Sequence, residues 1–211
     1  MPGRIHATQA APPAIAARDA ERRKSLGAEF TEVYPEPIDI VFEIGCGHGH
    51  FLAAYAAANP KTHCLGVDLV SKRIERAERK QRRFALHNLA FFKADAVETL
   101  AILPKHVRLE GIFVLFPDPW PKKRHHRRRI LQPSLLDALA VRAKPGAWLA
   151  LRTDDALYFD WASKQIENHH HWHIAPEFAW PFEHSTYFQE IKGPHQSLMC
   201  KWLPATNPAK P

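Results

Sequence analysis

Short apolar runs alternate with segments of helical periodicity along most of the chain. The apolar runs predict strands over residues 38–44, 63–68, 89–94, 111–116 and 147–153. The segments between and after them predict helices over residues 51–58, 71–86, 97–103, 131–143 and 154–168. Because strands that alternate with helices are typical of βαβ units, we expect an α/β fold with a mostly parallel sheet and helices on both faces.

The C-terminal part of the chain is rich in Trp, Phe and His. Its apolar spacing predicts an antiparallel strand pair over residues 187–192 and 198–202, at the edge of the sheet. With 211 residues and about 150 residues in a typical domain, we expect one domain with extensions. We assign this domain to residues 31–203, a flexible, basic and Ala-rich arm to residues 1–30, and a flexible tail to residues 204–211.

Composition indicates a globular protein. Apolar residues make up 45% and charged residues 24%, which excludes a disordered, collagen-like or coiled-coil chain. Cys46, Cys64 and Cys200 have no CxxC spacing and imply no disulfide framework. Prolines interrupt the Ala-rich N-terminal stretch, which makes it a poor signal peptide, and no apolar run approaches the roughly 18 residues that span a bilayer. We therefore expect a cytoplasmic protein without a membrane partner.

Glu43 precedes a glycine-rich turn, GCGHG at residues 45–49, that follows the first predicted strand. Gly45 and Gly47 allow a tight strand-to-helix turn and close approach of the backbone to a ligand, and Asp68 at the end of the second strand suits a ribose diol. The GxGxG spacing departs from the GxGxxG of dinucleotide-binding folds. It favours a nucleoside cofactor without a pyrophosphate, such as S-adenosylmethionine. The alternative is a turn with a purely structural role.

S-adenosylmethionine carries a cationic sulfonium and an ammonium group, so carboxylates at the strand ends can hold it. We expect Glu43 to face the methionyl end, Asp68 to accept hydrogen bonds from the ribose hydroxyls, and Asp95 to accept from the adenine edge. For Asp95 the alternative is an N-cap of the helix that follows it.

The fourth predicted strand leads into PDPWP at residues 117–121. Ligands of open α/β sheets bind beyond the carboxyl ends of the strands, so this segment should face the reactive methyl group. Its alternating prolines hold the backbone extended and form a rigid wall for an acceptor. The Trp120 ring offers a face on which a base can stack. The alternative is a proline-rich turn with Trp120 buried.

Six Lys and Arg residues and no acid follow in KKRHHRRR at residues 122–129. Without them the formal charge of +7 would fall to +1. We expect the arginines of this segment to neutralise phosphates, and charge reversal at residues 127–129 to reduce the salt dependence of RNA affinity. A solvated basic surface is the alternative, but attachment to the acceptor wall favours nucleic acid binding.

A second basic patch is predicted on the helix that follows the second strand. Its basic side chains recur at steps of three and four residues and so share one face: Arg73, Arg76, Lys80 and Arg83.

The segment FPDPWPKKRHHRRRI at residues 116–130 resembles the long signature of the bacterial tRNA (guanine-N7-)-methyltransferases, the TrmB family. The EIGCGHG turn, Asp68, the NL and ADA groups near Asp95, and LRTD at residues 151–154 support the resemblance, with a weaker echo at residues 186–193. The resemblance implies a class I S-adenosylmethionine-dependent methyltransferase fold, which is Rossmann-like. It also implies methylation of N7 of a guanine in the tRNA variable loop.

The resemblance further implies roles for single residues. Those that would contact the cofactor or line the methyl-transfer site are Glu43, Asp68, Asp95 and Asp118, with Asp118 as the catalytic residue. Those that would hold the tRNA are Lys122, Asp154, Thr186 and Gln189, beside the basic Arg124, Arg127 and Arg128. The family pattern Thr-x-x-Glu has Gln189 in the place of Glu in this chain, and an amide can hydrogen-bond a base edge without adding negative charge.

Guanine N7 has a free lone pair and no proton to lose, so its methylation depends on orientation more than on a strong base. Asp118 would orient the base and stabilise the positive charge that develops on it.

Two alternatives stay open: a methyltransferase that acts on another RNA, and a non-catalytic tRNA-binding protein. The histidine-rich stretch at residues 169–173 lacks a ligand pattern and predicts a solvated loop and no metal. We expect a monomer or a homodimer.

Overall fold

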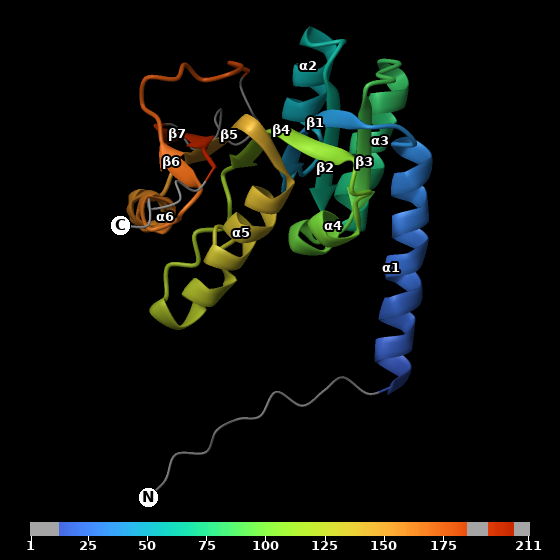
Figure 1. The fold of residues 1–211 in the computed structure, drawn as a ribbon, viewed down its shortest axis with the longest axis horizontal. Helices are drawn as coiled ribbons and strands as arrows, with labels where there is room; N and C mark the ends of the chain where they lie inside the picture. The colour runs from blue at the N-terminus through green and yellow to red at the C-terminus, as the bar shows by residue number, and fades with distance from the viewer. Residues whose placement is uncertain (1–12, 185–193, 205–211) are drawn as a thin grey trace, which may run out of the picture.

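The computed structural model describes residues 13–184 and 194–204. At its centre is a seven-stranded sheet in the order β3-β2-β1-β4-β5-β7-β6 (Figure 1). Strands β1 to β5 pair in parallel, whereas β7 runs antiparallel to β5 and to β6. The predicted α/β fold with an antiparallel C-terminal edge is confirmed. The strands are β1 (Ile38–Ile44), β2 (His63–Asp68), β3 (Leu89–Lys93), β4 (Val107–Leu115), β5 (Ala143–Thr153), β6 (Trp172–Ile174) and β7 (Gln196–Trp202).

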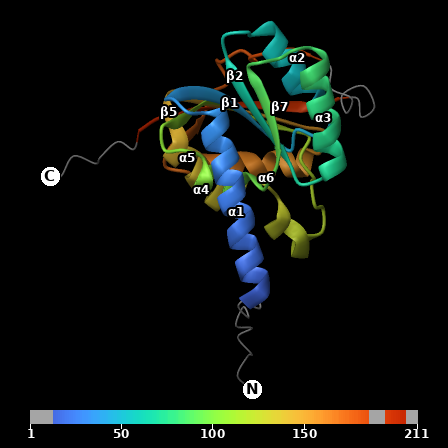
Figure 2. The same cartoon turned by 90° about the vertical axis from the view of Figure 1, so that its right-hand side faces the viewer.

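Helices cover both faces of the sheet (Figure 2). One face carries α2 (His50–Ala58) and α3 (Ser71–Arg83). The other face carries α1 (Pro13–Val33), α4 (Ala96–Ile102), α5 (Pro133–Arg142) and α6 (Ala156–Glu167). A short 3-10 helix, η1 (Lys123–Arg128), lies between β4 and α5. None of the helices in the described part of the chain combines the length and the apolar character that crossing a membrane requires.

The central strands are apolar on both sides because both sides are covered. In β1, Val41 packs into the cluster under α2 and α3, whereas Ile40 and Phe42 pack into the larger cluster on the opposite face. All three side chains are fully buried. Successive residues of a strand point to opposite faces, so burial on both faces yields the continuous apolar run seen in the sequence.

The Lys144-Pro145-Gly146 sequence predicts a turn, but these residues lie inside β5. The register changes from Leu109 opposite Ala143 to Gly111 opposite Trp148, so β5 bulges here. Lys144 anchors the bulge through ion pairs to Asp39 and Glu110, at 3.1 and 3.2 Å. The turn-forming residues are thus accommodated in the bulge, and α5 passes directly into the strand.

The predicted C-terminal strand at residues 198–202 is confirmed as part of β7. Its observed partners are β5 and the short β6. The partner predicted at residues 187–192 lies outside the described residues. The sequence does not reveal β6, because three residues are too few to show a period of two.

The flexible arm expected over residues 1–30 does not describe residues 13–30, which belong to helix α1. Leu26 and Phe30 are buried, and the Phe30 ring centroid lies 4.7 Å from that of Phe92. Arg22 and Arg23 both pair with the buried carboxylate of Glu98 on α4. These contacts join the C-terminal part of α1 to the domain, while the first turns extend beyond it (Figure 1). Leu26, Phe30 and Tyr34 recur every four residues, and this apolar stripe is the signal in the sequence.

Candidate functional site

The carboxyl ends of five neighbouring parallel strands carry most of the predicted site residues. Ile44 at the end of β1 lies beside Val114 of β4, and Glu43 lies beside Gly66 of β2. Since parallel strands end at the same edge, the segments that follow them meet there. In sheet order this edge contributes Asp95 after β3, Asp68 at the end of β2, Glu43 and the glycine turn at β1, Asp118 after β4, and Asp154 after β5.

The glycine turn is held against β2 by its own backbone. The N–H groups of Gly45 and Cys46 both donate to the Val67 carbonyl, at 2.9 and 3.0 Å. Gly45 and Gly47 have φ values of +72° and +54°, which favour glycine. A Cβ added to either would meet no atom within 4 Å, so the space beside the turn is open.

Gly49 of the same turn has a different role. A Cβ there would lie 2.6 Å from the Phe91 ring and 2.7 Å from the Ala77 Cβ, at a φ of +68°. This glycine therefore lets α2 pack closely on β3 and α3. The turn combines one packing glycine with two that face open space.

Asp68 is buried and joins the glycine turn to α3. Its Oδ2 accepts from the Gly47 N–H at 3.1 Å and from Arg73 Nη1 at 3.3 Å, and its Oδ1 accepts from the Val70 N–H at 2.8 Å. The sequence predicts Ser71 as the cap of this helix, but Val70 occupies the N-cap position of α3.

Glu43 is the unusual group of the site. Its side chain is buried, and Oε2 has no hydrogen-bond partner in the described structure. Burial, and to a smaller extent the nearby negative charge of Asp68, raise the pKa of its carboxyl to about 8. A buried carboxyl oxygen without a partner suits a ligand that brings a hydrogen-bond donor or a positive charge.

This raised pKa predicts a pH-dependent stability. Between about pH 4.5 and pH 8 the folded protein keeps a proton on Glu43 that the unfolded chain has released. The free energy of unfolding therefore falls as the pH rises through this window, by at most about 1.4 kcal/mol per pH unit from this group. Glu43→Gln is expected to remove this slope, measured as Tm from pH 5.5 to pH 8.

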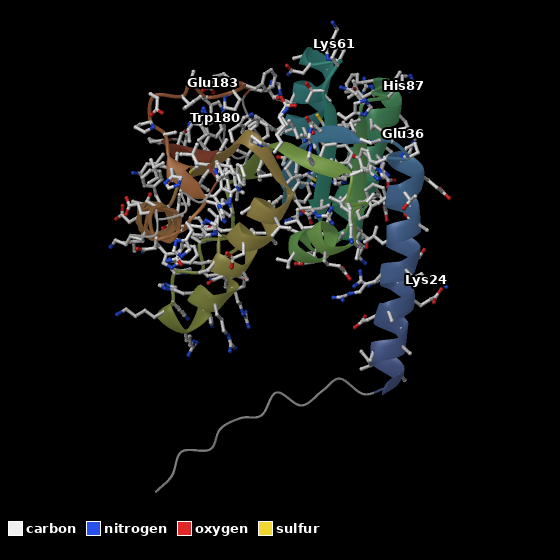
Figure 3. The ribbon with its side chains drawn as sticks, in the orientation of Figure 1. Lys24, Glu36, Lys61, His87, Trp180 and Glu183 are labelled. Carbon is white, nitrogen blue, oxygen red and sulfur yellow. The ribbon has the colours of Figure 1, made fainter. Side chains whose placement is uncertain are left out.

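The exposed Glu36, labelled in Figure 3, offers the matched control. Glu36→Gln should keep the slope of the natural protein. Parallel Tm curves for Glu43→Gln and the natural protein would show that Glu43 is ionised in the folded state throughout.

Asp95 takes the role that the sequence left as an alternative. It is the N-cap of α4, and its Oδ1 accepts from the Glu98 N–H at 3.0 Å. Capping occupies one lone pair of the carboxylate and leaves capacity for a further donor. The contact with an adenine edge stays a prediction.

Backbone strain marks both ends of the proline segment. Phe116 and Trp120 have φ values of +48° and +43°, a region that non-glycine residues rarely adopt. The Phe116 N–H donates to the Arg152 carbonyl at 2.7 Å, which ties the segment to β5. Between them Asp118 is exposed. Strain of this kind clusters at functional sites and persists only where the surroundings impose it.

Trp120 is half-buried and already has a cation on its ring. The Arg128 guanidinium lies 4.9 Å from the ring centroid, and the His125 ring packs edge-on at 5.8 Å. Trp120 is therefore neither the exposed stacking platform nor the fully buried tryptophan that the sequence left as alternatives.

The basic segment divides into exposed and buried members. Lys122, Arg124, Arg127 and Arg128 are exposed on or beside η1, as contact with phosphates requires. The expectation that Arg129 neutralises a phosphate is wrong, because its side chain is only 3% exposed. Arg129 Nε donates to the Pro119 carbonyl at 2.8 Å, and its guanidinium lies 5.5 Å from the ring centroid of Tyr158 and 5.0 Å from that of Trp161. Arg129 thus supports the proline segment from the side of α6.

Sequence reasoning missed Arg152 as an organiser of the site. This buried arginine of β5 forms two hydrogen bonds to Glu183, at 3.0 and 2.8 Å, and lies 3.9 Å from the ring centroid of Trp180. Figure 3 shows Trp180 and Glu183 in the segment that follows β6. Thr186 and Gln189, the predicted tRNA contacts further along, lie outside the described residues. The available signal in the sequence was an arginine, Arg152, inside the apolar strand predicted at residues 147–153.

In residues 13–184 and 194–204, no group of three or more His, Cys, Asp or Glu side chains could hold a metal ion. Cys46 is buried, and this burial raises the pKa of its thiol well above the ordinary value, so it is a poor nucleophile.

The parallel sheet with its antiparallel strand β7, and the glycine turn after β1 with carboxylates on the neighbouring strands, define a protein of the class I methyltransferase fold. Residues 38–191 match the family model described as "Putative methyltransferase", which is well over half of the chain. The chain belongs to this family.

Curated relatives of similar sequence carry the name tRNA (guanine-N(7)-)-methyltransferase. One from Treponema pallidum (strain Nichols) is 38% identical over 153 residues, which cover 72% of this chain and 61% of the relative. One from Halorhodospira halophila is 42% identical over 127 residues, which cover 60% of this chain and 55% of the relative. The chain thus spans roughly three fifths of the length of the relatives it matches.

Solved structures of similar fold include the 16S rRNA methyltransferase KamB, with a TM-score of 0.58, 18% identity, and coverage of 84% of this chain and 94% of that one. An rRNA methylase from Streptococcus thermophilus has a TM-score of 0.55 and 12% identity, and the match covers 85% of this chain and 95% of that one. At these identities the likeness shows the fold alone.

Proposed function

We propose that this protein transfers a methyl group from S-adenosylmethionine to N7 of a guanine in tRNA, with the variable loop as the site of the acceptor. The observation that carries the proposal is one sheet edge with three features: a buried, unpartnered carboxyl oxygen, an open glycine turn, and a strained proline segment that leads into a basic helix. The names of the curated relatives support the same reaction.

The residues at this edge fit the proposed cofactor. Glu43 Oε2 is buried without a partner in the described structure, and an ammonium group would supply the missing donor. The open space beside Gly45 and Gly47 lets a ligand approach the backbone. Asp68 already accepts backbone N–H groups, and its remaining lone pairs would accept ribose hydroxyls. When bound, the cofactor supplies an electrophilic methyl group on a sulfonium.

The acceptor side needs little proton chemistry. A guanine N7 lone pair is free at neutral pH, and the methylated ring becomes cationic. The exposed Asp118 carboxylate would orient the base and stabilise this developing charge. The proline segment holds Asp118 in a preset position, so little ordering is required at each turnover.

The remaining contacts belong to the tRNA. We propose that the exposed cations Lys122, Arg124, Arg127 and Arg128 bind its phosphates, and that Asp154, Thr186 and Gln189 position the nucleotide. We further propose that the protein acts in the cytoplasm, where the tRNA substrate is found. The monomer or homodimer expected from the sequence stays a prediction.

The direct test is nucleoside mass spectrometry of unmodified tRNA transcripts after incubation with the protein and S-adenosylmethionine. The expected product is 7-methylguanosine. A transcript with adenine in place of the variable-loop guanine is the control and should give none. Methylation at another atom, or in the control transcript, would contradict the proposed position. Absence of product from every tRNA, with S-adenosylhomocysteine still bound in calorimetry, would contradict the activity.

A further inference from the structure

A basic groove lies between α3 and the start of α2, apart from the proposed cofactor and tRNA contacts, and it contains most of the second basic patch predicted from the sequence. His48 and His50 line it from the glycine turn and the first turn of α2. Basic side chains line it from α3: Arg76, Arg79, Lys80, Arg82 and Arg83. Arg76, Arg79, Lys80 and Arg83 recur at steps of three or four, so they lie along one face of the helix.

Most of the positive charge of this groove is not compensated by acids, with Arg82 as the exception. Within the described residues, no ion pair joins Arg76, Arg79, Lys80 or Arg83 to a carboxylate, whereas the neighbouring Arg82 pairs with Glu78 at 3.7 Å. Partial burial lowers the pKa of Lys80, and the nearby Arg76 and Arg79 lower it further. Cations that crowd each other in this way gain from an added anion.

The groove is directly connected to the glycine turn. Lys80 Nζ donates to the His48 carbonyl at 2.9 Å, and Arg76 Nη1 lies 3.4 Å from His48 Nε2. An anion in the groove would therefore sit next to the backbone that the cofactor is proposed to approach.

The sheet order places the two basic elements of the protein on opposite sides of this turn. The turn follows β1, whose neighbours in the sheet are β2 and β4. Helix α3 follows β2, and η1 follows β4 through the proline segment. A polyanion in contact with both basic elements would have to cross the mouth of the proposed site.

We propose that this groove binds the phosphodiester backbone of the RNA acceptor, as a second contact besides η1. The inference rests on the proposed function for the identity of the polyanion, and it extends that function to a new surface. Arg76 and Arg83 are separated by about 10 Å along the helix axis. A nucleic acid strand presents about three charges over that length. A single phosphate or nucleotide would engage only part of such a row.

The test is the affinity for a tRNA transcript, measured by fluorescence anisotropy between 50 and 300 mM salt, roughly spanning physiological ionic strength. Arg79→Gln/Arg83→Gln removes two groove cations and leaves the His48 contacts of Arg76 and Lys80 in place. Lys105→Gln/Lys164→Gln removes the same charge at two exposed residues outside the groove. We expect the groove variant to bind about tenfold more weakly, with a salt slope lower by about 1–2, because each lost phosphate contact reduces the slope by about 0.9.

The control variant should match the natural protein in tRNA affinity and in methylation activity. The groove variant should keep its affinity for S-adenosylhomocysteine and show a raised KM for tRNA. Equal tRNA affinity in the two variants would overturn the proposal. Loss of affinity for polyglutamate but not for tRNA would also overturn it, in favour of an acidic protein partner. Binding is measured apart from methyl transfer. A natural protein that binds tRNA through the groove but yields no 7-methylguanosine would contradict the proposed function alone.

Discussion

Asp118→Asn is expected to lower kcat for guanine methylation by about 100- to 1000-fold, the effect of removing one group that stabilises developing charge. Asparagine keeps the shape of the side chain and removes its negative charge. The Tm should not change, because the Asp118 side chain is exposed and none of the hydrogen bonds or ion pairs of the described residues involves it. Single-turnover kinetics at saturating tRNA and cofactor would separate this loss from weaker binding.

Asp160→Asn is the matched control for this variant. Asp160 is also exposed, but it lies on α6 and outside the proposed site. It should retain the full rate of methyl transfer. If both variants were equally active, Asp118 would have no catalytic role and the proline segment would only support the acceptor.

Arg129→Met is expected to lower the free energy of unfolding by about 2–3 kcal/mol, because the variant leaves the Pro119 carbonyl without its buried donor and removes the cation from two aromatic rings. For a protein of this size the Tm should fall by roughly 4–12 °C. The rate of methyl transfer should fall as well, since Pro119 is the neighbour of Asp118 and loses the contact that holds it. Thermal unfolding and tRNA methylation measured on the same preparation test both parts.

Arg127→Met is the contrasting variant from the same basic run. Arg127 is exposed, so its replacement should leave the Tm unchanged and weaken tRNA binding with a lower salt slope. If Arg129→Met behaved like Arg127→Met in both measurements, the buried contacts of Arg129 would have no structural value. The pair thus separates support of the wall from contact with phosphate within one short segment.

Much of the fold was predictable from local patterns. The strands at Ile38–Ile44 and His63–Asp68 match the structure residue for residue, because both are apolar runs ended by a glycine turn or by an acid. The bulge at residues 144–146 was not predictable, since the same Lys-Pro-Gly sequence forms a turn in most surroundings. Pairing with β4 and the ion pairs of Lys144 decide its conformation, and both depend on residues far away in the chain.

The candidate site was likewise predictable only in part from the sequence. The glycine turn with Glu43 and Asp68 indicated a nucleoside cofactor from the sequence, and the basic run at residues 122–129 indicated a polyanionic acceptor. Whether Glu43 had a partner could not be predicted, because a hydrogen bond to a buried oxygen comes from whichever element packs on it. The difference between Arg128 and Arg129 was equally hidden, since one residue of rotation directs one side chain to solvent and the other toward α6.

The amino-acid sequence by itself determined the alternation of strands and helices, the glycine turn, the proline segment and the net positive charge, since each depends on the chemistry of residues that are neighbours in the chain. Only the tertiary structure decided which carboxylates and cations share an edge. The order β3-β2-β1-β4 places α3 and η1 on either side of the turn. Packing against α6 buries Arg129, whereas Arg127 and Arg128 face solvent. Packing between distant segments sets that order, and no local pattern records it.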